Sequence, residues 1–286
     1  MAEVVLSLPQ ELQADYEAVE PLFEGKLRSQ YKVRHRESGE VRVVKVMRAH
    51  HVNDENLQLR FRREARAARR IVHPHIARFY DFVLLADRAC LIKEHIPGRS
   101  LLQIINHEGP PEVSYSVRIA LQVLDALAYI HGEGYVHRDV APDNFVVEDR
   151  EDGPMTRLAD LGIAKRLGGG EDLTEAGTFV GKARYSAPEQ FKEAPEDPRS
   201  DIYSFGVVLY ELLTGLHPVR GNTFADHFRG HVMRPPRDFE ETDPYGRVPE
   251  GLRDAVRASL EKEPEKRYQD AREFAEAIEP FVNVES

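Results

Sequence analysis

The sequence has one cysteine, Cys90, and no run of about 20 consecutive apolar residues of the kind that a membrane span needs. A single cysteine excludes an internal disulfide and argues against a zinc cluster, which suits a reducing compartment. The start "MAEVVLSLPQ" lacks the basic residues of a signal peptide. A formal net charge of -10 argues against a nucleic-acid partner. We therefore expect a cytoplasmic protein with no membrane segment in this chain; its oligomeric state cannot be read from the sequence.

The apolar pattern changes once along the 286 residues. Residues 20–95 read as short strands around one helix, and later residues follow helical spacing. A helical pattern ends at Gly132, and the stretch 201–215 is apolar nearly all round, with Asp201 near its cap. We predict an α+β fold with a small β-sheet lobe containing one long helix and a larger, mainly helical lobe. The strand candidates are 22–35, 40–48, 79–86 and 89–94, with short strands near 144–148 and 156–159.

Two charged residues of the smaller lobe occupy apolar patterns. Lys45 falls on the same strand face as Val43 and Met47. Glu64 falls on the apolar stripe of a helix that starts near Asn53. Because burying an unpaired carboxylate is costly, the pattern favours a Lys45–Glu64 pair. The alternative is two surface charges with buried stems.

The larger lobe contains the residue types that phosphoryl transfer needs. In "HRDVAPDN", residues 137–144, Asp139 precedes Asn144 by five positions, and "LADLGIAK" places Asp160 at a strand end. Asn144 and Asp160 offer the hard oxygen ligands that magnesium prefers. Asp139 is suited to orient an attacking hydroxyl, and a lysine would hold the phosphates. These residues together predict phosphoryl transfer.

With these motifs the sequence resembles the protein kinases, specifically the eukaryotic-like Ser/Thr kinases of bacteria, over about residues 16–282. The resemblance implies one two-lobed kinase domain over 1–286, divided into a β-rich lobe at 16–95 and a helical lobe at 96–282. It also implies that ATP and Mg²⁺ are used to phosphorylate a protein substrate. Lys45 would hold the α- and β-phosphates with Glu64 as its partner, and Asp139 would be the catalytic base. Asp160 and Asn144 would be the first and second metal ligands.

The same resemblance assigns supporting residues. "SAPEQ", residues 186–190, matches the end of the activation segment, where Glu189 should pair with Arg267 of "EKRY". Asp201 matches the acid that supports the backbone of "HRD". The hinge would be "KEHI", where backbone groups of Glu94 and Ile96 should meet adenine.

The phosphate-covering loop departs from the family pattern. "LFEGKLRSQYK", residues 22–32, retains only Gly25, with Phe23 and Arg28 where glycines are usual. Side chains there hinder the close backbone approach that glycine allows. Gln30 replaces the valine that packs on adenine, and Val43 replaces the usual alanine, so both narrow or polarise the adenine slot. Gly25 and Val43 are still assigned to the nucleotide site.

Lys93 stands at the gatekeeper position behind the adenine, where an apolar or hydroxyl residue is commoner. It would either reach Glu64 or Asp160 and compete with Lys45, or bend toward solvent.

A second departure concerns the charge beside the catalytic base. Ala141 stands where the resembling Ser/Thr kinases have a lysine, and Lys182 of "GKARYSAPE" stands where they have a threonine. We predict that Lys182 supplies the missing cation near Asp139. The alternative is an exposed loop lysine beside a lost catalytic one.

Regulation is predicted on the segment between "DLG" and "APE". A phosphate on Thr174 or Thr178 could pair with Arg138 and order this segment. The alternative is two exposed loop threonines.

Three functions remain open. The first is a Ser/Thr protein kinase, and the second is a pseudokinase that acts as a nucleotide-binding or scaffolding module. The third is a small-molecule phosphotransferase, which would not be expected to carry "SAPEQ" followed by "DIYSFG". The sequence names no substrate and no regulator.

Overall fold

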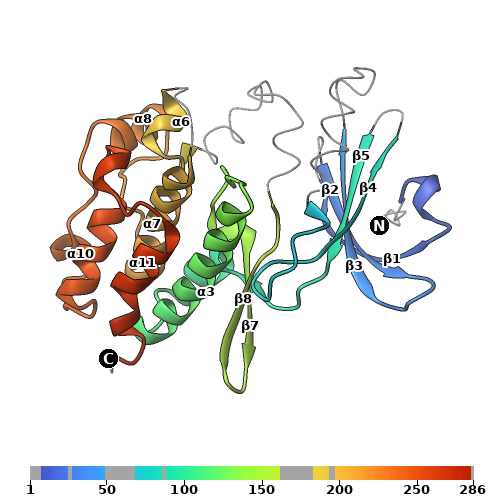
Figure 1. Cartoon of the computed structure of the whole chain (residues 1–286), viewed down its shortest axis with the longest axis horizontal. Helices are drawn as coiled ribbons and strands as arrows, with labels where there is room; N and C mark the ends of the chain where they lie inside the picture. The colour runs from blue at the N-terminus through green and yellow to red at the C-terminus, as the bar shows by residue number, and fades with distance from the viewer. Residues whose placement is uncertain are drawn as a thin grey trace. The chain divides into compact units, whose positions relative to one another are not determined.

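The computed structural model describes residues 8–24, 28–48, 68–85, 88–161, 183–192 and 197–284 (Figure 1). These residues form two compact units that divide between Ile96 and Pro97. The first unit is built on an antiparallel sheet, and the second is mainly helical.

The sheet of the first unit has five strands in the order β1-β2-β3-β5-β4, preceded by the short 3-10 helix η1, Gln10–Leu12. All neighbouring strands pair antiparallel. The long helix that we predict here contains Glu64 and lies outside the described residues, which resume at Ala68. Ala68 is buried. The strands are β1 Tyr16–Glu24, β2 Arg28–His35, β3 Val41–Arg48, β4 Phe79–Leu84 and β5 Arg88–Glu94.

The prediction of one strand over 22–35 is wrong. This stretch contains the end of β1 and all of β2, which pair as a hairpin with Tyr16 opposite His35 and Glu24 opposite Ser29. Alternation of apolar and polar residues runs in both arms of an antiparallel pair, so the pattern could not show where the chain reverses. The other three strand predictions match β3, β4 and β5 within two residues.

One face of this sheet is covered by the N-terminal segment. Leu8 and Leu12 pack with side chains of β1, β2, β3 and β5, among them Val33, Val44 and Ile92. Successive residues of a strand point to opposite faces. Lys45 therefore lies on the face opposite the one that Leu8 and Leu12 cover, as the period-2 pattern predicts.

The second unit surrounds the buried helix α7, Pro198–Thr214. Helix α7 begins three residues before the predicted start, with Asp197 as its N-cap accepting from the Arg199 N–H and with Pro198 at its first position. Asp201 lies in its first turn and is 1% exposed. The helix ends at Gly215, whose left-handed φ of 72° suits a glycine.

Seven further helices and a three-stranded sheet, β6-β7-β8, complete the described part of this unit. The strands are β6 Arg99–Ser100, β7 Phe145–Arg150 and β8 Gly153–Leu158. The helices are α2 Leu101–Glu108, α3 Val113–Gly132, α6 Pro188–Phe191, α8 Phe224–Val232, α9 Phe239–Thr242, α10 Glu250–Ser259 and α11 Ala271–Ile278. Three short 3-10 helices are η2 Pro142–Asn144, η3 Pro264–Lys266 and η4 Glu279–Phe281.

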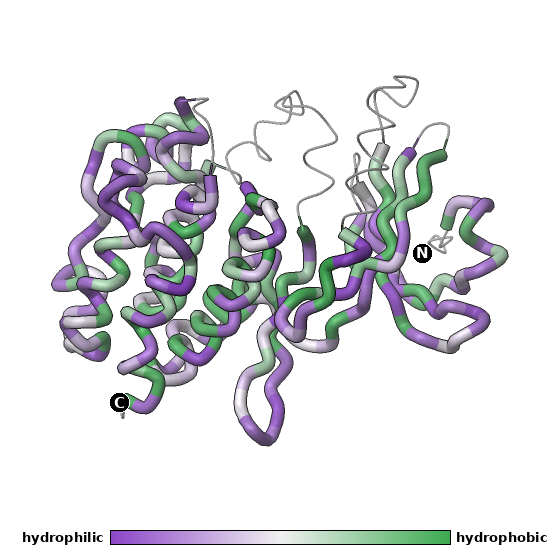
Figure 2. Tube along the Cα trace, viewed as in Figure 1, coloured by the Kyte–Doolittle hydropathy of each residue, from purple (hydrophilic) through white to green (hydrophobic). Residues whose placement is uncertain are grey.

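Helix α3 is long and apolar enough, by length and composition, to cross a membrane. However, more than half of its most apolar stretch is buried inside the protein. The helix packs against α7, α11 and β8, and Figure 2 shows hydrophilic as well as hydrophobic residues along it. Burial against neighbouring elements is the behaviour of a core helix, so α3 is weak evidence for a membrane span.

Candidate active site

The loop 137–144 between α3 and β7 holds Asp139 and Asn144 together. The Asn144 Nδ2 donates to the backbone oxygen of Asp139 at 2.7 Å and to its Oδ2 at 3.3 Å. A carbonyl oxygen can only accept, so the amide nitrogen must face Asp139 and the Oδ1 must face elsewhere. In the described part of the chain this Oδ1 accepts no hydrogen bond. It therefore fits a metal ligand, the role predicted for Asn144.

His137 joins the backbone of Asp139 to that of Asp160. Its Nδ1 accepts from the Asp139 N–H at 3.2 Å, and its Nε2 lies 2.6 Å from the Asp160 carbonyl oxygen. Both contacts are satisfied by one form, the neutral ring with its proton on Nε2. The ring is 4% exposed. This buried imidazole ties the predicted catalytic base to the predicted metal ligand, a role that the sequence motifs do not indicate for His137.

Asp201 supports the loop from α7, as predicted. Its Oδ2 accepts from the His137 N–H at 2.7 Å, and its Oδ1 accepts from the Arg138 N–H at 2.8 Å. The His131 Nε2 of α3 also donates to Oδ2, at 2.8 Å. Three donors therefore compensate one buried carboxylate.

Arg138 has a φ of 65°, the left-handed region that a residue with a side chain rarely adopts. Such a conformation costs about 1–2 kcal/mol. A hydrogen bond to a charged group contributes about 1.5–3 kcal/mol, so the two backbone bonds to Asp201 outweigh this cost. The Gln190 Nε2 also donates to the Arg138 oxygen at 3.1 Å. The loop therefore keeps a strained turn immediately before Asp139, while the Arg138 side chain is exposed.

The predicted pair of Glu189 and Arg267 is confirmed. Two guanidinium nitrogens of Arg267 contact the two carboxylate oxygens of Glu189 at 2.8 and 2.9 Å. Ser200 Oγ donates to Glu189 at 2.7 Å, and Arg267 also donates to backbone oxygens, including that of Lys262. Burial by itself would raise the pKa of Glu189, but the bonds and charge of Arg267 outweigh it and lower that pKa. This pair joins α6 to the segment before α11.

The chain just before α6 is fixed by two buried histidines. His217 Nε2 and His231 Nε2 each donate to the Arg184 oxygen at 2.8 Å. The Arg184 side chain and the Tyr185 hydroxyl both contact Glu211 of α7, at 2.5 and 2.7 Å. Burial lowers the pKa of His217 to about 4, so its ring is neutral at pH 7. Sequence reasoning missed this arrangement because two scattered histidines give no pattern.

In the first unit, Lys45 and Val43 are both buried on one face of β3, at 7% and 5% exposure. A lysine is almost never this buried unless it is paired. Its predicted partner Glu64 lies outside the described residues, so the pairing stays a prediction. Lys93 lies opposite Val43 in the β3–β5 ladder and is half-buried, which does not decide between its two predicted directions.

The backbone of the predicted hinge is only partly available to a ligand. The Glu94 N–H donates to the Arg78 oxygen at 2.8 Å, and the Glu94 carboxylate accepts from the Arg78 N–H at 3.0 Å. This excludes the Glu94 N–H as a donor to adenine. Within the described chain the Ile96 N–H has no acceptor, so it could donate to the edge of adenine.

Several predicted site residues lie outside the described residues, namely Gly25, Glu64, Thr174, Thr178 and Lys182. Among the described ones, no group of three or more His, Cys, Asp or Glu side chains could hold a metal ion. A magnesium ion on Asp160 and Asn144 would therefore take its other ligands from water and phosphate, as this ion commonly does.

Comparisons with known proteins show which family this chain is similar to. The family model "Protein kinase domain" matches residues 16–278. Serine/threonine-protein kinase pkn3 of Myxococcus xanthus is 36% identical over 256 residues, which cover 88% of this chain and 47% of pkn3. PknB of Mycobacterium leprae, also named a serine/threonine-protein kinase, is 33% identical over 235 residues, covering 81% of this chain and 37% of PknB.

Among solved structures, the kinase domain of Mycobacterium tuberculosis PknI matches with a TM-score of 0.71 and 26% identity, covering 93% of this chain and 96% of that one. The expected fold, with a small antiparallel-sheet lobe and a mainly helical lobe, is thereby confirmed. The chain spans less than half the length of the two curated relatives named above.

Proposed function

Because the chain belongs to the protein kinase domain family, we propose that it transfers the γ-phosphate of ATP to a serine or threonine hydroxyl of a protein substrate. The names of its curated relatives support the Ser/Thr class. The observation that carries the proposal is the loop 137–144, in which Asn144 holds Asp139 and His137 ties it to Asp160. We treat residues 1–286 as one domain, with lobes at 16–95 and 96–282, and keep the cytoplasmic location as a prediction.

In this proposal Asp139 is the catalytic base. Its carboxylate accepts the proton of the substrate hydroxyl and orients the oxygen for in-line attack. Asn144 uses its amide nitrogen to hold Asp139 and its oxygen to bind Mg²⁺, together with Asp160. When bound, the ion neutralises charge on the transferred phosphate.

Binding of the nucleotide is assigned to the first unit. Lys45, paired with Glu64, would hold the α- and β-phosphates, and Gly25 and Val43 would adjoin the nucleotide. Adenine would bind through the backbone at 94–96. Burial of Lys45 at 7% exposure supports its role, because a surface lysine would leave its ammonium group in water.

Two further parts of the proposal concern segments near the base. A phosphate on Thr174 or Thr178 would pair with Arg138, whose side chain is exposed. Lys182 would supply a cation next to Ala141. The loop 137–144 itself contains two basic residues, Arg138 and His137, and His137 is neutral in this arrangement.

A pseudokinase is the alternative, and the phosphate-covering loop favours it. Phe23, at a position where glycine is usual, ends up 43% exposed on β1, and Gln30 lies directly opposite Lys45 in the β2–β3 ladder. Side chains at these places would obstruct or polarise the approach of the nucleotide.

Transfer of radiolabelled γ-phosphate to a generic protein substrate tests the proposal. Asp139→Asn and Lys45→Met should each abolish transfer while melting near the starting temperature. Lys266→Met, which changes an exposed lysine that pairs with Glu263 away from the catalytic loop, should leave the rate unchanged. A thermal-shift titration with ATP and Mg²⁺ on the unmodified protein separates the alternatives. Stabilisation by ATP without transfer would establish the pseudokinase, and transfer that survives Asp139→Asn would refute the mechanism.

A further inference from the structure

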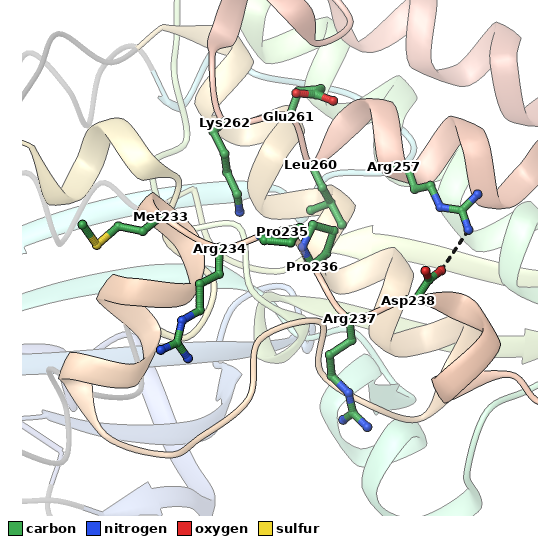
Figure 3. Close-up of a pocket in the computed structure, with 10 residues that line it drawn as sticks. All are labelled: Met233, Arg234, Pro235, Pro236, Arg237, Asp238, Arg257, Leu260, Glu261 and Lys262. Atoms are coloured by element: carbon green, nitrogen blue, oxygen red, sulfur yellow. Dashed lines mark hydrogen bonds and ion pairs between the residues drawn. The ribbon is translucent and has the colours of Figure 1, made fainter.

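The second unit contains a pocket of about 410 Å³ that is not part of the catalytic loop (Figure 3). It is lined on one side by residues 233–238, which follow α8, and on the other by Arg257, Leu260, Glu261 and Lys262 at the end of α10. Its volume lies in the range of about 300–1,000 Å³ typical of ligand sites. None of the residues assigned to phosphoryl transfer lines it.

The charged side chains that line this pocket are mostly basic. Its lining includes four basic side chains and two acidic ones. Arg257 pairs with Asp238 at 3.2 Å, the dashed contact in Figure 3, and Arg237 pairs with Glu241 at 2.7 Å. In the part of the chain that the structure describes, Arg234, Glu261 and Lys262 form no ion pair. Figure 3 shows the ammonium group of Lys262 directed into the pocket, whereas the carboxylate of Glu261 points away from it.

Lys262 is held in place by neutral groups only. Its Nζ donates to the Tyr203 hydroxyl at 2.9 Å and to the Gly230 oxygen at 3.1 Å, which uses two of its three N–H groups. Burial and the charge of Arg267 lower the pKa of Lys262 to about 8, and Glu261 offsets them only in part. A bound anion would compensate this charge and accept the remaining hydrogen bond.

A directed chain of hydrogen bonds connects Lys262 to the segment before α6. His231 Nε2 must donate to the Arg184 oxygen, since a carbonyl can only accept. Burial lowers the pKa of His231 well below its ordinary value, so the ring is neutral and its Nδ1 accepts from the Tyr203 hydroxyl at 3.0 Å. Tyr203 in turn accepts from Lys262. The Lys262 ammonium group thus fixes the direction of every bond up to Arg184.

We propose that this pocket binds an acidic segment of a partner protein, which places a carboxylate or a phosphate against Lys262 and an apolar side chain against Met233. Charge complementarity selects an anionic ligand. Met233 is 72% exposed, and Arg234 and Pro235 beside it are also exposed. An extended peptide suits this open rim better than an enclosed small molecule, because peptide groups can continue along residues 233–235.

Binding would also stabilise the series of hydrogen bonds that runs from Lys262 through Tyr203 and His231 to Arg184. It would thereby hold residues 183–187 in place. Any effect of this on phosphoryl transfer rests on the proposed function. Binding itself does not, because it can be measured without ATP.

Fluorescence anisotropy with labelled decapeptides tests the site. The probes are a peptide of alternating leucine and glutamate, the same peptide with phosphoserine in place of glutamate, and one with glutamine. The glutamine peptide should bind at least about tenfold more weakly than the better of the two anionic peptides, since a charge-assisted hydrogen bond contributes about 1.5–3 kcal/mol. The ranking of the two anionic peptides identifies the natural group. Equal binding of all three, or no binding, would overturn the proposal.

Variants locate the site. Lys262→Met should weaken binding of the anionic peptide about tenfold or more, because it removes the same charge-assisted hydrogen bond. Arg234→Glu, at an exposed residue without an ion pair, should weaken it without affecting folding. The matched control is Lys266→Met, which changes an exposed lysine that pairs with Glu263 outside the pocket. Unchanged binding in both Lys262→Met and Arg234→Glu would show that the peptide binds elsewhere.

The pH dependence adds a signature that a purely structural lysine would not give. Of the groups that face Lys262, Tyr203 stays protonated because burial raises its pKa, and His231 stays neutral because burial lowers its pKa. Arg267 and Glu261 are the charged groups that act on Lys262. Affinity should therefore be full at pH 7 and fall as pH rises past about 8, where Lys262 loses its proton. Lys262→Arg should bind without this decline. A pH-independent affinity in the unmodified protein would contradict the assignment.

Coupling to Arg184 has its own readout. Addition of the anionic peptide should shift the NMR signals of the His231 ring nitrogens in the unmodified protein. The shift should be much smaller in Tyr203→Phe, which lacks the bridging hydroxyl. If the peptide binds without a shift at His231, the coupling to Arg184 is refuted, whereas the binding site itself is supported.

Discussion

Replacing Asp201 by asparagine removes one acceptor from a carboxylate that receives three hydrogen bonds. The amide oxygen can replace one carboxylate oxygen, but the amide nitrogen must then face either the Arg138 N–H or the donors from His137 and His131. A donor would thus face a donor inside a site where the side chain of Asp201 is 1% exposed. Asparagine cannot satisfy this arrangement in either orientation.

The structure gives the size of the effect. One lost hydrogen bond to a charged group costs about 1.5–3 kcal/mol, and the remaining bonds become ordinary ones of about 0.5–1.5 kcal/mol. Together these changes should lower the free energy of unfolding by about 3–6 kcal/mol. The left-handed backbone of Arg138, which costs about 1–2 kcal/mol, is then no longer outweighed. We expect the turn to relax and Asp139 to move with it.

Urea denaturation and steady-state kinetics measure the two consequences. Asp201→Asn should reduce kcat by about 10²-fold, the cost of displacing a reacting group by about 1 Å, with little change in KM for ATP. Asp197→Ala is the control, because it removes the N-cap of the same helix, costs about 1 kcal/mol and leaves the loop untouched. If Asp201→Asn loses no more stability than this control, or keeps kcat within about twofold, the support role is wrong.

Three other predictions follow from the site and its surroundings. Glu189→Gln leaves a buried guanidinium without a charged partner and turns an amide donor toward it, and it should lower the free energy of unfolding by about 3–5 kcal/mol in urea. Because the pKa of Glu189 is lowered, its contribution is full above the ordinary carboxyl pKa and lost as pH falls through the folded value, so stability of the variant should decline less in acid. Lys182→Ala should reduce turnover by about 10²–10³-fold, and Ala141→Lys with Lys182→Thr should restore much of it; a rate within about twofold would exclude the exchange. Mass spectrometry after incubation with ATP should find phosphate on Thr174 or Thr178, and full activity with both changed to alanine would rule out regulation there.

Sequence reasoning predicted what depends on local pattern or on fixed spacing. Alternation located β3 and placed Lys45 on one face, and the apolar run located α7. The partners of Asp201 and Arg267 were predicted from the family motifs. No periodicity could have shown them, because the two contacts join residues that are 64 and 78 positions apart.

What the sequence could not predict depends on how elements meet. The reversal between β1 and β2 was missed because alternation continues through both strands. His231 was missed because a histidine on an amphipathic helix is usually read as polar surface. It is buried here, and it donates to the Arg184 oxygen, which lies 47 residues away in sequence. The left-handed turn at Arg138 was also missed, because a residue distant in sequence stabilises it. The hydrogen bond from the Arg138 N–H to Asp201 offsets the cost of this backbone conformation.

The two histidine contacts suggest how this chain fixes backbone next to its chemistry. His137 and His231 each donate from Nε2 to a carbonyl oxygen and accept at Nδ1, so each must be neutral with its proton on one defined nitrogen. A protonated ring would present N–H groups at both nitrogens, which would oppose the N–H of Asp139 in one case. In the other case it would reverse the Tyr203 hydroxyl toward Lys262, which is itself a donor. The same neutral form of histidine therefore positions both the catalytic base and the segment before α6. At His231, an anion bound at Lys262 would strengthen the hydrogen bonds that hold this segment.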